Sequence, residues 1–85
     1  MRWHSLLARL ADAYRRDERF AEARDVYTTA IDLLGPPRPE HWGLFFSRGI
    51  CADRLGDFEG TVTDMREALR LNPDQPQVLN YLGYS

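Results

Sequence analysis

Lysine is absent from this sequence of 85 residues, and all eleven basic side chains are arginines. The arginines are outnumbered by 13 aspartates and glutamates and are interleaved with them, so no basic stripe of the kind that binds nucleic acid is present. Long hydrophobic runs are also missing, which excludes a membrane-spanning helix. We therefore expect no nucleic acid as a partner and no membrane insertion by this segment. A formal net charge of −2 and 44% hydrophobic residues are typical of one small soluble domain.

Residues with reactive or metal-binding side chains are scarce. The single cysteine, Cys51, excludes an internal disulfide, and we expect a small buried side chain there rather than a reactive thiol. The two histidines, His4 and His41, do not have the spacing of metal ligands. Paired carboxylates such as Asp17 and Glu18 fall on an expected turn, and the sequence lacks a phosphate-binding loop and a nucleophile elbow. We expect no catalysis, no cofactor and no metal.

What the sequence does contain is a repeat of itself. The same pattern starts three times, at intervals of 38 and then 34 residues, with Leu10-Ala11, Arg48-Gly49 and Leu82-Gly83. Other residue types recur at the interval of 38, as in Phe20 and Phe58, Tyr27 and Met65, and Ala30 and Ala68. A fixed period near this length is typical of stacked helical units, which bury their apolar faces against one another.

The repeat resembles the tetratricopeptide pattern, in which two antiparallel helices carry characteristic bulky and small residues over about 34 positions. The first copy reads Leu7, Leu10, Ala11, Tyr14, Ala23, Tyr27 and Ala30, with Gly35 where proline is usual. The second reads Phe45, Arg48, Gly49, Ala52, Thr61, Met65, Ala68 and Pro73, and a third starts with Leu79, Leu82 and Gly83. This resemblance covers nearly the whole chain. It implies an all-α fold, a right-handed solenoid of antiparallel helix pairs with about two and a half repeats.

The pattern divides the chain into repeats and helices. We expect a single domain over 1–85, with repeat one over 4–37, an insertion within 35–41, repeat two over 42–75 and a partial third repeat over 76–85. The five expected helices cover 2–16, 20–34, 39–54, 58–71 and 76–84. Asp57 is a predicted N-cap, and Pro39 and Pro76 suit the first turn of a helix. The four inserted residues form either a longer loop or an extra helical turn carrying Glu40 to Trp42, and both can hold together.

The same positions predict how the helices pack. Small residues are expected at the closest helix contacts, namely Ala11, Ala23, Ala30, Gly49, Ala68 and Gly83. Bulky residues are expected to fill the surrounding core, namely Leu7, Leu10, Tyr14, Phe20 and Tyr27. Burial of one such side chain stabilises the fold by roughly 1.5 to 3 kcal/mol.

Two positions depart from the family pattern. Arg48 stands where a leucine is expected between helices, so it must be paired or must extend to solvent. We predict a structural ion pair with Asp64 or Asp32. Trp42, with Trp3 near the corresponding place in the first repeat, either packs at the repeat junction or lies exposed as an interface anchor. We predict packing at the junction.

The resemblance also implies a binding surface, because the first helix of each tetratricopeptide pair lines a groove. The candidate groove residues are Ala8, Asp12, Arg15, Arg16, Phe46, Ile50, Asp53, Arg54, Asn80 and Tyr84. Members of the family that bind chaperones hold a C-terminal carboxylate with lysines and asparagines, whereas the first-repeat positions here are Ala8 and Asp12. A carboxylate clamp is therefore unsupported.

We instead predict a protein or peptide partner with apolar anchors set against Phe46, Ile50 and Tyr84. Its acidic flank would meet Arg16 and Arg54. The alternative is that Phe46 and Ile50 pack against a neighbouring helix of the protein.

These observations favour a protein-interaction scaffold without chemistry of its own. The alternatives are a structural self-assembly module, a regulatory or targeting arm of a larger protein, and helix-turn-helix DNA binding. The partial third repeat and the C-terminal segment resemble parts of bacterial tetratricopeptide proteins, so we expect a fragment of one, able to form a homo-oligomer through exposed terminal helices. The compartment stays open between cytoplasm and periplasm.

Overall fold

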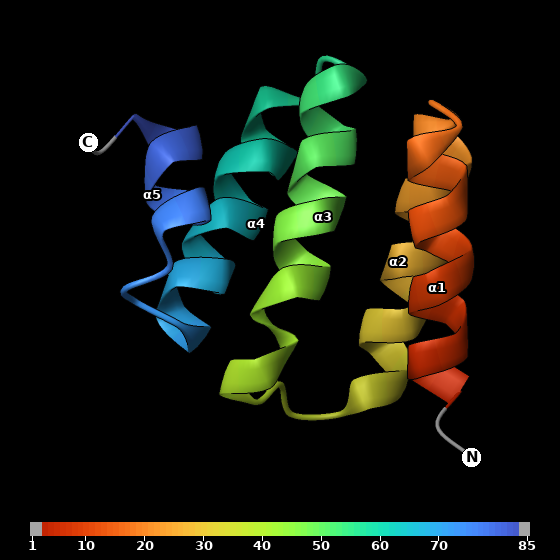
Figure 1. Ribbon diagram of the computed structural model, residues 1–85, viewed down its shortest axis with the longest axis horizontal. Coiled ribbons are helices and arrows are strands. Elements are labelled where there is room, and N and C mark those ends of the chain that lie inside the picture. Colours follow the sequence, from red (N-terminus) through yellow and green to blue (C-terminus); the bar gives the residue numbers. More distant parts are fainter. Residues whose placement is uncertain (1–2, 84–85) are drawn as a thin grey trace.

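The computed structural model of the protein describes residues 3–83, which form helices and no strands (Figure 1). The elements are α1 (Trp3–Arg16), α2 (Phe20–Leu34), the 3-10 helix η1 (Pro39–His41), α3 (Trp42–Arg54), α4 (Phe58–Leu71) and α5 (Pro76–Leu82). The predicted all-α class and the succession of five helices are confirmed. The predicted helix bounds agree with the structure within three residues at every end.

The helices lie in two layers (Figure 1). Helices α1, α3 and α5 form one layer, here called the front layer, and α2 and α4 form the rear layer behind them. Helix α1 packs antiparallel to α2, and α3 packs antiparallel to α4, while α2 also contacts α3. Each helix pair therefore stacks beside the next, as the repeated sequence predicts.

The turns within the two helix pairs have the same backbone geometry. The amide of Arg19 donates to the carbonyl of Tyr14 over 2.9 Å, and the amide of Asp57 donates to that of Ala52 over 2.8 Å. Such a turn needs one residue with a left-handed backbone, which is Gly56 at φ 81° in the second pair. The Asp57 carboxylate then accepts a bond from the amide of Gly60 over 3.0 Å, which confirms the predicted N-cap of α4.

Both interpretations of the four inserted residues hold. The loop over 35–38 is followed by the single 3-10 turn of η1, which starts at Pro39 and leads directly into α3 at Trp42. Pro76 likewise occupies the first turn of α5, as predicted. However, α5 ends at Leu82 because Gly83 adopts a left-handed backbone at φ 83° and caps the helix. The predicted close helix contact at Gly83 is therefore wrong, since Gly83 is exposed.

The core follows the predicted pattern of small residues between bulky ones. Five of the six small residues are buried, namely Ala11, Ala23, Ala30, Gly49 and Ala68. Tyr27 and Met65, which occupy equivalent positions of the two repeats, are both fully buried. The prediction for Leu10 is wrong, because this side chain is 45% exposed. Leu10 occupies the same repeat position as Arg48. Arg48 contacts Thr28 of the preceding helix pair, whereas no helix pair precedes α1 among residues 3–83, so Leu10 has no such neighbour.

The two departures from the family pattern are both resolved by contacts. Arg48 is held bidentately by Asp64, with its Nε 2.9 Å from Oδ2 and its Nη2 2.7 Å from Oδ1, so the predicted ion pair is confirmed with Asp64 as the partner. Trp42 packs against the buried cluster around Phe45 and Met65, as predicted for a repeat junction. The same prediction is wrong for Trp3, which is 63% exposed.

Candidate functional site

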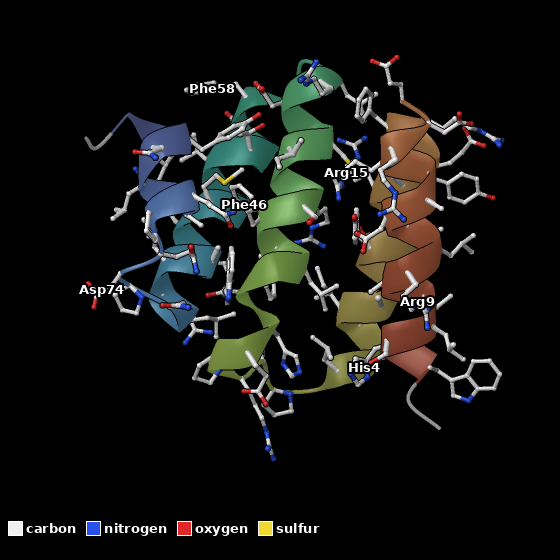
Figure 2. The ribbon with its side chains drawn as sticks, viewed as in Figure 1. His4, Arg9, Arg15, Phe46, Phe58 and Asp74 are labelled. Carbon is white, nitrogen blue, oxygen red and sulfur yellow. The ribbon has the colours of Figure 1, made fainter. Side chains whose placement is uncertain are left out.

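A row of aromatic side chains joins the front helices α3 and α5. The rings of Trp42 and Phe46 have centroids 5.8 Å apart, and the rings of Phe46 and Tyr81 meet edge to face at 6.0 Å. Figure 2 shows Phe46 between α3 and α5. Aromatic pairs in such geometries add roughly 0.5 to 1.5 kcal/mol beyond their buried area. We call Trp42, Phe46 and Tyr81 the aromatic row.

Trp42 and Phe46 of the aromatic row, and Ile50 on the same helix, pack against the core and keep part of their surface in contact with solvent. Phe46 and Ile50 are half-buried and pack against the buried cluster that contains Phe45, Met65 and Val78. Each side chain therefore has an inner edge in the core and an outer edge on the protein surface. Phe46 and Ile50 thus pack within the protein, as one of the two interpretations has it, and whether a partner binds their outer edges stays a prediction.

On α5 the neighbour of Phe46 is Tyr81, and not Asn80 as the repeat period predicts. The period pairs Phe46 with Asn80, which is exposed, whereas the structure brings the Tyr81 ring to Phe46. The Tyr81 hydroxyl donates to Oδ2 of Asp53 over 2.6 Å. Partial burial and then the bond to Asp53 raise the pKa of Tyr81 to about 12. Sequence reasoning missed Tyr81, although it lies one residue from the predicted Asn80 and is the only aromatic within α5.

The predicted groove residues Asp12 and Arg15 are held by a tyrosine from the rear layer. The buried Tyr27 hydroxyl donates to Oδ1 of Asp12 and accepts a bond from Nε of Arg15 over 3.1 Å. Asp12 and Arg15 also lie within ion-pair distance of each other, at 3.7 Å. In Figure 2 Arg15 lies in the space between α1 and α3. The hydroxyl of Tyr27 binds polar atoms of both side chains. Asp12 and Arg15 are therefore held in place on the front layer.

Because of Tyr27, we expect the protein to become less stable as the pH rises into the alkaline range. Burial first, and then the bond to Asp12, raise the pKa of Tyr27 from 10.0 to about 12. A group whose pKa is raised on folding stabilises the protein fully below its unfolded pKa and loses this contribution as pH rises to its folded pKa. We expect the free energy of unfolding to fall by about 2 to 3 kcal/mol across this interval. Urea unfolding should show a shallower decline in Tyr27→Phe, and equal slopes for both proteins would contradict the assignment.

The two arginines predicted to meet an acidic flank lie in different surroundings. The guanidinium carbon of Arg54 is 5.8 Å from the centroid of the Phe20 ring, at the end of α3. Arg16 instead lines a hollow on the outer side of α1 together with Leu10 and Tyr14. Of the remaining predicted positions, Ala8 is half-buried, Asp53, Arg54 and Asn80 are exposed, and Tyr84 lies outside the described residues.

Reactive groups do not gather on this surface. Cys51 is fully buried, and burial raises the pKa of its thiol, as for a structural cysteine. The His4 and His41 rings meet edge to face at 5.7 Å, and Nδ1 of His41 accepts a bond from the amide of Arg38. Within residues 3–83 no three histidine, cysteine or acidic side chains are placed to hold a metal ion. No helix in that range is long and apolar enough to cross a membrane.

The fold and the front layer define a helical repeat protein. A family model described as Tetratricopeptide repeat matches residues 8–76, and the chain belongs to the tetratricopeptide repeat family. No solved structure matches the chain. Repeats of this family generally mediate protein–protein interaction and typically act as non-catalytic scaffolds.

Proposed function

We propose that the chain is a non-catalytic scaffold that holds a peptide or helix of a partner protein against the front layer. The observation that supports this function is the aromatic row, in which Phe46 and Tyr81 bring α3 and α5 together and keep ring edges on the surface. Partly exposed aromatics held by their neighbours are typical of binding hot spots, because the partner buries apolar area without ordering mobile side chains.

Polar groups lie at one end of the apolar centre and would fix the orientation of a bound segment. Asp53 and Arg54 are exposed at the C-terminal end of α3, and Asp53 is aligned by the Tyr81 hydroxyl. Arg54 is supported by the Phe20 ring. We therefore expect a partner segment whose apolar anchor sits on Phe46, Ile50 and Tyr81 and whose acidic residue reaches Arg54. Tyr81 takes the place that the sequence assigned to Tyr84.

A peptide library tests this proposal and does not require the natural partner. Random peptides displayed on phage are selected on the wild-type chain, and the enriched sequences are synthesised with a fluorescent label. We expect them to share apolar anchors with an adjacent acidic residue. Fluorescence anisotropy should show binding weakened by about tenfold or more in Tyr81→Ala and in Phe46→Ser, as for hot-spot residues.

Matched variants separate recognition from folding. Phe46→Ser removes a side chain that also packs on the core, so circular dichroism must confirm that this variant stays helical. Tyr81 is 37% exposed and Leu33, on α2, is 55% exposed, so Leu33→Ala is a control for Tyr81→Ala on the rear layer. Leu33→Ala should bind like wild type. Equal affinities of Tyr81→Ala, folded Phe46→Ser and wild type would contradict the proposed function.

A further inference from the structure

Phe58, at the start of α4, is the most exposed large hydrophobic side chain within residues 3–83, with 75% of its surface accessible. Its counterpart in the first repeat, Phe20, is half-buried and lies under the guanidinium of Arg54. Figure 2 shows Phe58 at the edge of the molecule, at the N-terminal end of α4. Within residues 3–83 this aromatic position is thus covered by an arginine in the first repeat and uncovered in the second.

An apolar hollow of about 290 Å³ adjoins Phe58. It is lined by Asp53, Phe58, Thr61, Val62, Arg66, Tyr81 and Leu82. The Asp53 carboxylate already accepts a bond from Tyr81 and keeps further lone pairs for another donor. An aromatic face next to a carboxylate is a favourable site for an arginine, which stacks on the ring and donates to the acid.

The same face of α4 carries an arginine of its own. Phe58, Val62 and Arg66 are four residues apart, so they form one ridge along the helix, with Phe58 and Arg66 each about 6 Å from Val62 along the axis. Arg66 is exposed and has no ion-pair partner in the part of the chain that the structure describes, unlike Arg48 or Arg70. Arg66 lines the same hollow as Phe58 and Asp53 without forming an ion pair there within residues 3–83. The ridge therefore carries an exposed aromatic ring at one end and an arginine without an ion-pair partner at the other.

We infer that this face of α4 is a two-fold interface with a second copy of the chain. When two α4 helices cross antiparallel at Val62, Arg66 of each copy reaches Phe58 and Asp53 of the other, and both contacts form at once. Such self-complementarity is what a two-fold dimer requires, since every contact occurs twice. Ridges of residues four apart also interlock in the commonest packing of helix pairs, at a crossing angle of about 50°. Arg54 over Phe20 shows the same contact within one chain.

This interface meets the surface of the proposed function at Asp53 and Tyr81, which also line the hollow beside Phe58, but it does not use Phe46, Ile50 or Arg54. The dimer ridge itself is on α4 of the rear layer. The interface also differs from assembly through the terminal helices alone, because the contacts centre on α4, although Tyr81 and Leu82 of α5 line the same hollow. The residues altered in the test, Phe58 and Arg66, are not part of the proposed peptide site, so variants that fail to dimerise should still bind the selected peptides.

Sedimentation velocity of charge-altered variants tests the dimer. Wild type should shift from monomer to dimer as its concentration rises through the micromolar range. Phe58→Lys and Arg66→Glu, each alone, should stay monomeric, with dimer affinity reduced by about tenfold or more. An equimolar mixture of the two should form a heterodimer, because the lysine introduced in one copy then meets the glutamate introduced in the other. The native contact between Phe58 and Arg66 is kept on the opposite side of the same interface.

Two controls complete the test. Leu33→Lys adds a charge at an exposed position of α2 and should dimerise like wild type. Circular dichroism should be unchanged in all variants, because the altered residues are exposed. A wild-type protein that stays monomeric throughout would overturn the inference. So would single variants that dimerise normally, a mixture that stays monomeric, or self-association abolished by Trp3→Lys and not by Phe58→Lys.

Discussion

Replacement of Asp64 by alanine is expected to lower the free energy of unfolding by about 3 kcal/mol, because the Arg48 guanidinium would lose the one ionic partner that it has among residues 3–83. The side chain of Asp64 is 7% exposed and that of Arg48 is 21% exposed. Asp64 accepts two bonds from Arg48, and the remaining Arg48 bond, to Thr28 Oγ1 over 3.3 Å, is to a neutral hydroxyl. Thr28 cannot neutralise the charge that Asp64 leaves behind.

Two further variants identify the cause of this loss. Asp25→Ala removes an exposed carboxylate from α2 and should change stability by less than about 0.5 kcal/mol. The double replacement Arg48→Met with Asp64→Leu removes both charges and should recover most of the stability, since apolar residues of similar size often replace a buried ion pair at little cost. Urea unfolding at neutral pH measures all three variants. An Asp64→Ala protein as stable as Asp25→Ala would show that the pair contributes nothing.

The second large effect is expected at Gly49, where α3 and α4 approach closely. A Cβ atom there would lie 2.9 Å from Cε of Met65, so the end of that side chain would have to move, and 3.1 Å from Cβ of Asp64, which is tighter than most real contacts. Gly49→Val should therefore destabilise the protein by about 2 to 3 kcal/mol, through overpacking of a filled contact. In a domain of this size such a loss lowers the Tm by at least about 8 °C.

Gly43→Val is a matched control, because the same substitution at Gly43 makes no close contact with α4. It lies near the start of α3, and a Cβ at this position would meet no atom within 4 Å. Gly43→Val should leave the Tm within a few degrees of wild type, because valine has a somewhat higher helix propensity than glycine and clashes with nothing. Thermal unfolding followed by circular dichroism distinguishes the two variants. Equal Tm values would mean that α3 and α4 do not depend on a small residue at their contact.

The helices could be predicted from the sequence because their signals are local. Pro39, Pro76, Asp57 and Gly56 mark helix ends through backbone geometry that each residue imposes by itself. The repeat then pairs the helices, since an alanine or glycine at a fixed period allows close approach. The Arg48 ion pair was predictable for a similar reason, because a charge at a packed position requires a counterion nearby.

The contacts that were missed depend on what lies beside each helix. Leu10 and Trp3 occupy positions that a neighbouring repeat covers in the family pattern, so the pattern assigned them to the core although no described helix lies there. Tyr27 was predicted only as a bulky residue that fills the core. Its hydroxyl also reaches Asp12 and Arg15, and that contact depends on the distance between helices rather than on the period.

The contact between α5 and Phe46 likewise could not be predicted from the repeat period alone. The period of 34 residues places Asn80 beside Phe46, but a long aromatic side chain reaches further than its backbone position indicates, and Tyr81 makes the contact. The sequence predicts a site on the first helix of each repeat, including α3 and α5, while the choice of Tyr81 as its third anchor rests on the side-chain geometry. Tyr84, the anchor that the sequence predicts, lies outside the described residues.

The central proposal, recognition of a partner segment by the front layer, is tested most directly by an amide chemical-shift titration. The isotope-labelled wild-type chain is titrated with a peptide enriched by display, and each shifted amide is assigned to its residue. We predict that the largest shifts cluster on α3 and α5 around Phe46, Ile50 and Tyr81 and extend to Arg54. Largest shifts confined to α2 and α4 of the rear layer would contradict the proposal.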